Sequence, residues 1–168
     1  ALKLDWKSLD ISNASVLVSN LPYSIAASIV VEMSLLDIFD SMILMFQKEV
    51  AQRVAAKEGN KVYGVISVLV QAFYNVEYLF DVSEQSFQPP PKVKSGVIRL
   101  LPNKETPQMK SEKDFFNLVK TAFNQRRKTL RNAVRNLFET EMLEDDIFDK
   151  RAEQLSVKQF AALTFKMK

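Results

Sequence analysis

The stretch ASVLVSNLPYSIAASIVVEMSLLDIFDSMILMF, residues 14–46, indicates the fold class of this chain. It holds two short apolar runs, residues 14–20 and 41–46, which predict two buried strands. Leu21-Pro22 ends the first run in a turn, and Ser24 is placed to cap a helix between the runs. The buried face of that helix is expected to be Ile25, Ile29, Met33 and Leu36. Because the order strand, helix, strand favours parallel pairing, the sequence predicts an α/β sheet.

The same pattern continues to about residue 101. A polar helix is expected over residues 47–57, and an apolar helix over 65–72 follows a break at Gly59-Asn60. Two β-rich runs, residues 75–82 and 94–101, are expected to pair antiparallel at a sheet edge.

The composition changes at residues 102–107, PNKETP, and the later pattern is helical. We therefore expect two domains, residues 1–102 and 103–168. In the second, Ser111 and Ser156 each begin a capping-box pattern. The helix after Ser111 is expected to bury Phe116, Val119 and Phe123. The next helix is expected to bury Leu130, Ala133, Val134, Leu137 and Phe138.

Composition excludes several classes of protein. The 168 residues include no Cys and no His, which rules out disulfides, thiolate metal sites and Ser-His-Asp hydrolases. The apolar runs are shorter than the roughly 20 residues of a membrane span, so we expect neither a membrane partner nor a metal. A cytoplasmic location is expected because no secretory signal opens the sequence.

Charge is segregated within the C-terminal part of the chain. Residues 115–138 contain six basic and no acidic residues, whereas 139–149 contain six acidic and no basic residues. The predicted helix at FNQRRKTLRN, residues 123–132, would place Arg127, Arg131 and Arg135 on one face. Such a face suits nucleic-acid phosphates, although a solvated helix face is the alternative. The basic residues considered for RNA contact here are Arg126, Arg127, Lys128, Arg131 and Arg135, with Lys48 and Arg53 extending the surface.

The tetrapeptide Asn20-Leu21-Pro22-Tyr23 lies at the carboxyl end of the first predicted strand, where open α/β sheets bind ligands. The Asn20 side-chain oxygen and a backbone carbonyl beside Pro22 can accept both hydrogens of a planar exocyclic amine. Tyr23 offers a face for base stacking. The alternative interpretation is a strand-ending turn with a half-buried Tyr.

A second candidate segment is FQPPPKVKS, residues 87–95, between the two β-rich runs. Its prolines hold Phe87 in a fixed place, where it can close a base pocket, and Lys92 and Lys94 can contact phosphate. The alternative is a loop that blunts a sheet edge, with Phe87 as a core residue.

Taken together, NLPY, FQKEVAQRV, FQPPPKVKSGVIRL and FNQRRKTLRN resemble, in order, the bacterial ribosomal RNA small-subunit adenine dimethyltransferase family. The resemblance implies the second half of a Rossmann-like S-adenosylmethionine-dependent methyltransferase sheet and a small helical domain that binds rRNA. It implies dimethylation of two adjacent adenosines in the 3′-terminal hairpin of small-subunit rRNA, within an immature small ribosomal subunit. Asn20 and the Leu21 carbonyl would bind the target amine beside Pro22, and Tyr23 and Phe87 would pack on the base.

The sequence departs from this family at the methyl-donor site. Its only glycines are Gly59, Gly64 and Gly96, so the family's glycine-rich donor loop has no counterpart. Asn20 is the only remaining donor-binding candidate, and residues 1–6 resemble the stretch that follows the donor site. We therefore expect a fragment that does not bind the donor alone, with a hydrophobic strand edge that a homodimer can cover. A non-catalytic rRNA-binding assembly module and a large-subunit, antibiotic-resistance methyltransferase are the alternatives.

Overall fold

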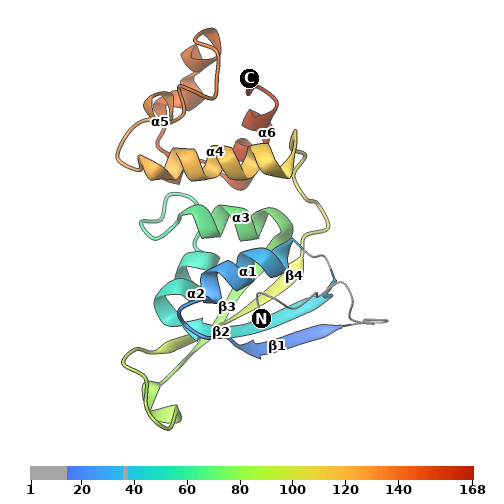
Figure 1. Ribbon diagram of the computed structural model, residues 1–168, viewed down its shortest axis with the longest axis vertical. Coiled ribbons are helices and arrows are strands. Elements are labelled where there is room, and N and C mark those ends of the chain that lie inside the picture. The colour runs from blue at the N-terminus through green and yellow to red at the C-terminus, as the bar shows by residue number, and fades with distance from the viewer. Residues whose placement is uncertain (1–14, 36–37) are drawn as a thin grey trace. The chain divides into compact units, whose positions relative to one another are not determined.

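The computed structural model describes residues 15–35 and 38–168 (Figure 1). The expectations for residues 1–6 and for Leu36 lie outside these residues. The chain divides into two compact units, one containing described residues up to Ala55 with Phe73–Lys104, the other Ala56–Ala72 with Glu105–Lys168.

The segment 56–72 lies in the second unit, although the sequence analysis placed it in the first domain. Two long-range hydrogen bonds explain this grouping. The Tyr63 hydroxyl donates to the Leu155 carbonyl at 3.1 Å, and the Gly59 amide donates to the Glu153 carbonyl at 2.7 Å. Contacts between residues so distant in sequence cannot be predicted from local composition, on which the predicted domain boundary was based.

A four-stranded sheet forms the first unit, in the order β1-β2-β4-β3. Its strands are β1 (Val16–Asn20), β2 (Ser41–Gln47), β3 (Tyr74–Val82) and β4 (Ser95–Pro102). β1 and β2 pair in parallel, as predicted, and β3 and β4 pair antiparallel, as predicted. β4 also pairs antiparallel with β2, so it is an inner strand and only β3 lies at that edge.

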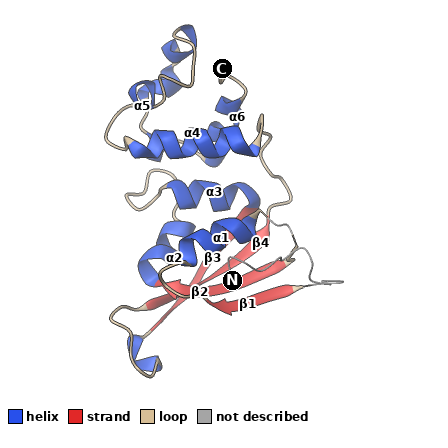
Figure 2. Cartoon of the chain, viewed as in Figure 1, coloured by secondary structure: helices blue, strands red, loops and turns tan. Residues whose placement is uncertain are grey.

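One face of the sheet carries the core of this unit. Met42, Leu44 and Phe46 of β2 are fully buried on it. Helices α1 (Ala26–Ser34) and α2 (Lys48–Ala55) lie on one side of the sheet (Figure 2). A Cβ atom added at Gly96 would lie 2.9 Å from the Ala51 Cβ, so the lack of a side chain there lets α2 approach β4 closely.

The prediction that residues 14–20 form a buried strand is wrong for the exposed side of β1. Val16 is 57% and Val18 72% exposed. Among the described strands, β1 pairs only with β2 and ends the sheet. Apolar composition indicates a strand, but its burial depends on what packs against its edge and faces.

Ser24 does not cap α1. The N-cap residue is Ile25, without a side-chain hydrogen bond, and α1 buries Ala26, Ile29, Val30 and Met33. Ile25 is only partly buried, because a turn over residues 23–25 precedes the helix.

The second unit is helical. Its elements are α3 (Val65–Phe73), which ends at the boundary with the first unit, α4 (Glu112–Asn124), α5 (Leu130–Ala133), α6 (Val157–Thr164) and three short 3-10 turns. Both predicted N-caps are confirmed: Ser111 accepts from the Asp114 amide, and Ser156 forms a capping box with Gln159.

Two predictions in this unit need correction, one for the side chains that α4 buries and one for the length of the helix after it. α4 buries Phe115, Leu118, Val119 and Ala122, whereas Phe116 and Phe123 are only partly buried. The helix predicted after it is reduced to α5. The chain leaves the helix at Val134, and Phe138 packs edge-on against Phe148 at a centroid distance of 5.0 Å. This tertiary contact takes precedence over the local helical pattern.

Over the described part of the chain, no helix is long and apolar enough to cross a membrane. Within the same residues, no group of three or more acidic side chains is arranged to hold a metal ion.

Candidate functional site

A pocket of about 380 Å³ lies beside the carboxyl end of β1. We call it the base pocket, after the base that the sequence resemblance predicts for Tyr23 and Phe87. It brings together two segments that were predicted separately from the sequence, the tetrapeptide that starts at the last residue of β1 and the proline-rich segment before β4. Its lining residues are Asn20, Leu21, Pro22, Tyr23, Phe87, Pro89 and Pro91.

The tetrapeptide is held by backbone hydrogen bonds. The Leu21 amide donates to the Met45 carbonyl at 2.9 Å, which ties the turn to β2. The Pro22 carbonyl accepts from the Ile25 amide at 3.2 Å. Within the described residues, the exposed Asn20 side chain and the Leu21 carbonyl take part in no hydrogen bond. Two oxygen acceptors next to each other in sequence are therefore available to a ligand.

The Tyr23 side chain is anchored by a residue to which the sequence analysis assigned no role. Its hydroxyl lies 2.7 Å from the Ser95 Oγ, and Ser95 is only 1% exposed at the start of β4. A buried hydroxyl needs a partner, and Tyr23 supplies it. A Ser that begins a buried strand was the only sequence signal for this contact.

Phe87 is placed by a short 3-10 turn, Glu84–Ser86. The Ser83 side chain accepts from the Gln85 amide, and the Phe87 amide donates to the Glu84 carbonyl at 3.3 Å. Phe87 is partly buried, and the peptide bond between Gln88 and Pro89 is cis. Aromatic rings from two segments thus border the base pocket, which suits a flat aromatic ligand.

A second pocket, also of about 380 Å³, lies at the start of α2. We call it the α2 pocket, and its lining residues are Gln47, Lys48, Glu49, Gln52, Val93 and Lys94. Of the predicted RNA contacts, Lys48 and Lys94 line this pocket. Lys92 is exposed beside it in sequence but is not part of the lining.

Lys48 is part of a charged network at the wall of the α2 pocket. Its ammonium lies 2.5 Å from an Asp81 carboxylate oxygen, and the Tyr78 hydroxyl donates to the other oxygen. The hydrogen bonds from Lys48 and then Tyr78 hold the pKa of Asp81 below its usual value. Burial, followed by the hydrogen bond to Asp81, raises the pKa of Tyr78 above its usual range. Arg53, on the same helix, forms an ion pair with Glu49 at 2.7 Å.

The structure contradicts the predicted arginine face in the second unit. Arg131 lies in the four-residue α5, whereas Arg127 and Arg135 lie in turns before and after it. A turn cannot continue the helical repeat, so the three side chains do not share one helix face.

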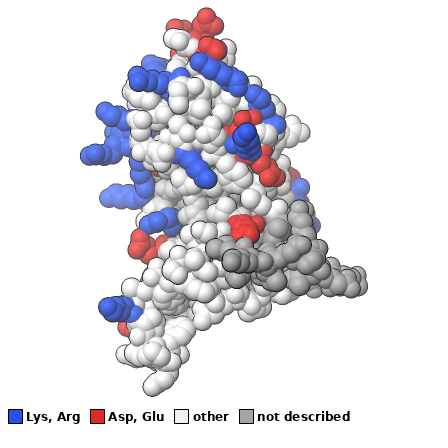
Figure 3. Space-filling view, in the orientation of Figure 1, with Lys and Arg blue, Asp and Glu red and all other residues white. Residues whose placement is uncertain are grey.

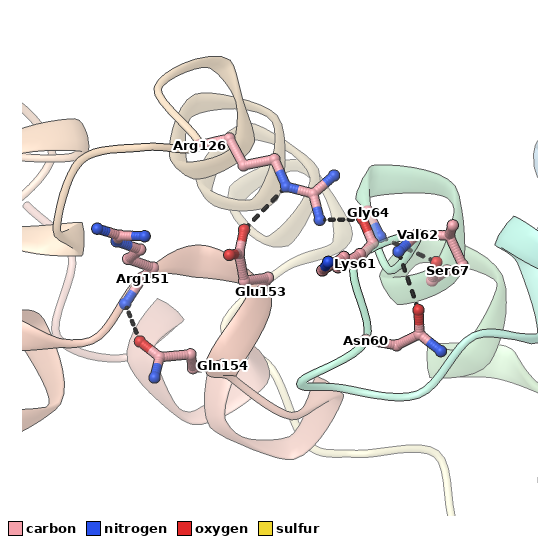
Figure 4. A network of polar contacts seen from close by, with 9 residues as sticks. All are labelled: Asn60, Lys61, Val62, Gly64, Ser67, Arg126, Arg151, Glu153 and Gln154. Atoms are coloured by element: carbon pink, nitrogen blue, oxygen red, sulfur yellow. Dashed lines mark hydrogen bonds and ion pairs between the residues drawn. The ribbon is translucent and has the colours of Figure 1, made fainter.

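Two of the arginines considered for RNA contact bind within the protein. Arg126 forms an ion pair with Glu153 at 2.8 Å and donates to the Lys61 carbonyl (Figure 4). Arg131 forms an ion pair with Asp149 at 2.9 Å and donates to the Leu143 carbonyl at 3.0 Å.

Other cations of this stretch are exposed. Arg127, Lys128 and Arg135 form no ion pair with any acid in the described ranges. Basic side chains gather on the left of the face shown in Figure 3, over the second unit.

Comparison with known proteins agrees with this geometry. The sequence model described as "Ribosomal RNA adenine dimethylase" matches residues 1–166. Ribosomal RNA small subunit methyltransferase A of Cytophaga hutchinsonii is 53% identical over 150 residues, covering 88% of this chain and 58% of that protein. The protein of the same name from Flavobacterium johnsoniae is 51% identical over 153 residues, covering 90% and 59%.

Two solved structures share the fold. A dimethyladenosine transferase from Plasmodium falciparum has a TM-score of 0.77 at 27% identity, covering 87% of this chain and 64% of that one. The 23S rRNA methyltransferase ErmE has a TM-score of 0.65 at 16% identity, covering 96% and 70%. The predicted Rossmann-like methyltransferase fold class is thereby confirmed.

The chain spans 58% and 59% of the length of these two curated relatives. The match to the family model nevertheless runs over nearly the whole chain. The chain therefore belongs to the ribosomal RNA adenine dimethylase family.

Proposed function

We propose that this chain is the target-base and RNA-binding part of a cytoplasmic rRNA adenine N6-dimethyltransferase. Its substrate would be two adjacent adenosines in the 3′-terminal hairpin of small-subunit rRNA, within an immature small subunit. The observation that supports this most directly is the base pocket, where free oxygen acceptors and two aromatic rings border one cavity. The small-subunit relatives share about half of the residues of this chain, whereas the large-subunit enzyme ErmE shares 16%.

In this proposal the base pocket orients the N6 amine of an adenosine that has left its base stack. The Asn20 side-chain oxygen and the Leu21 carbonyl accept the two N–H hydrogens of the amine. Pro22 has a fixed φ angle and so restricts the backbone that joins Leu21 to Tyr23. Tyr23 and Phe87 pack against the base. These two hydrogen bonds reduce the delocalisation of the nitrogen lone pair into the ring, which makes the nitrogen more nucleophilic. Catalysis then depends mainly on the positioning of the amine.

The methyl donor would be S-adenosylmethionine. The described residues provide little of a site for it: Gly59 is the only one of the three glycines with a positive φ, and no two glycines are close in sequence. Among the described residues, Asn20 in the lining of the base pocket is the one candidate for a donor contact. Titration of S-adenosylmethionine into this chain should show no binding, and micromolar binding would overturn this assignment.

RNA binding would use the exposed cations Arg127, Lys128 and Arg135, with Lys92 and Lys94 near the base pocket. Charge reversal at Arg127 or at Arg135, each alone, should weaken rRNA binding and flatten its salt dependence, because fewer counterions are released. Reversal of Lys104, an exposed cation outside these sets, is the matched control. Equal losses for both changes would contradict the assignment.

The catalytic proposal is tested in an enzyme of family length that contains these residues. Asn20→Ala should lower kcat by at least about 10²-fold, because it removes a polar contact to the reacting amine. The substrate is immature small subunits, with large-subunit RNA as the specificity control. A kcat within a few-fold of the unchanged enzyme would refute the role of Asn20.

Methylation of large-subunit RNA alone would favour the alternative family, and RNA binding without any methylation would favour a non-catalytic assembly module.

We also propose that a second copy covers the outer edge of β1. The exposed Val16 and Val18 support this, since unpaired strand edges with apolar side chains favour association. Sedimentation should show a dimer that Val18→Lys converts to a monomer. A monomeric unchanged chain would refute the dimer.

A further inference from the structure

We infer that the α2 pocket binds the nucleotide next to the one held in the base pocket. This inference rests on the proposed function, because it presumes that the base pocket holds a nucleotide of an RNA strand. The α2 pocket has the same volume as the base pocket, about 380 Å³, and shares none of its lining residues. It is therefore a separate cavity large enough for a group of similar size.

The two pockets are neighbours along two strands. On β2, Met45 is the register partner of Asn20 in the base pocket, and Gln47 of the α2 pocket follows two residues later. On the other side, Ser95 contacts Tyr23 of the base pocket, and the adjacent Lys94 lines the α2 pocket. A strand advances about 3.3 Å per residue, and nucleotides are on the order of 3.4 Å apart along one strand of a duplex, further when splayed. The residues that border the two pockets are thus one or two positions apart along the chain, about 3–7 Å of strand, which consecutive nucleotides can span when splayed.

The lining of the α2 pocket suits a nucleotide. The side-chain amides of Gln47 and Gln52 each offer a donor and an acceptor to a base edge. The Lys94 charge helps to lower the pKa of Asp81, but Lys94 is exposed and forms no ion pair with an acid of the described chain, so its ammonium can still meet a phosphate. Val93, 44% exposed, adds an apolar contact.

The remaining charges of this pocket are already balanced. The Lys48 ammonium is held by Asp81, which also accepts from Tyr78, and the Glu49 carboxylate is paired with Arg53. These contacts fix the wall and leave Lys94 as the cation that can attract a new anion. The balance also argues against a site for a small multivalent anion, which would need several free cations.

The test compares two hairpin RNAs, one intact and one that lacks only the base beside the target adenosine. Binding of this chain to each is measured by fluorescence anisotropy at one salt concentration. Gln52→Ala should weaken binding of the intact RNA by about fivefold, as expected for one lost hydrogen bond, and leave binding of the abasic RNA within about twofold. Lys94→Gln should weaken binding of both RNAs about equally, because the abasic RNA keeps the phosphate, and by more than Lys92→Gln.

Lys92→Gln is the matched control, because it removes the same charge from the same segment outside the pocket lining. It should weaken both RNAs equally. If Gln52→Ala also weakens both RNAs equally, or if Lys94→Gln weakens them no more than Lys92→Gln does, the second nucleotide site is refuted. Failure of the proposed function looks different: the unchanged chain would bind neither RNA, or Tyr23→Ala would leave both affinities unchanged.

Discussion

The hydrogen bond between Tyr23 and Ser95 gives a prediction that separates two similar substitutions. The two oxygens are 2.7 Å apart, and burial is asymmetric: Ser95 is 1% exposed, whereas Tyr23 is only partly buried. Ser95→Ala leaves the Tyr23 hydroxyl able to reach water, so it should cost only the net hydrogen bond, about 1 kcal/mol of unfolding free energy. Tyr23→Phe leaves the Ser95 hydroxyl buried without its partner, which should cost about 1–3 kcal/mol.

The assay is urea unfolding of the unchanged chain, both single variants and the double variant. The double variant should cost less than the sum of the single variants, with a coupling free energy of about 1 kcal/mol. A melting temperature should fall by about 2–4 °C for each 1 kcal/mol in a chain of this size. Additive effects, or a larger loss from Ser95→Ala than from Tyr23→Phe, would refute the inferred anchoring of Tyr23.

Three further predictions concern stability. Gly96→Ala should destabilise the chain by about 1–3 kcal/mol in urea unfolding, because the new Cβ would lie 2.6 Å from the Tyr78 hydroxyl; an unchanged midpoint would contradict the close packing. The pKa of Asp81 is lowered on folding, so its ion pair stabilises the fold above the usual Asp pKa of about 3.9, and this contribution is lost as the pH falls through the lower folded-state pKa. Asp81→Asn should therefore reduce stability at pH 7, and this loss should shrink as the pH falls below the usual Asp pKa; a loss that is the same at every pH would count against the pair. Arg131→Gln should lower the melting temperature more than Arg127→Gln, because only Arg131 binds the Leu143 carbonyl and Asp149; the reverse order would be inconsistent with these contacts.

Local signals in the sequence predicted many of the elements correctly. The apolar runs of β1 and β2, the helices α2 and α3, and the two capped helices after Ser111 and Ser156 are confirmed. Each depends on residues within one or two turns or on strand alternation, so the pattern contains the required information.

The ordered motifs also predicted the family, and two of them predicted the members of the base pocket. Asn20 and Tyr23 lie next to each other along the chain, but Phe87 reaches the same cavity only through the folded sheet. The sequence indicates that the segments around Asn20 and Phe87 are both candidates for a site. That they line one pocket depends on the pairing of β4 with β2.

Only the tertiary structure decided which cations are paired and which β1 side chains are buried, because both depend on contacts between residues that are distant along the chain. Composition indicated six cations in residues 115–138, but Arg126 and Arg131 are held by Glu153 and Asp149, which belong to later turns. Apolar β1 residues predicted burial, yet Val18 is exposed, because it pairs in register with Ile43 and so lies on the face of the sheet opposite the buried Met42 and Leu44. The sequence alone determined the order of elements and the chemistry of each segment, because both are local. Folding decided which charges remain free and which hydroxyl anchors Tyr23, because both depend on partners that the chain brings near only in three dimensions.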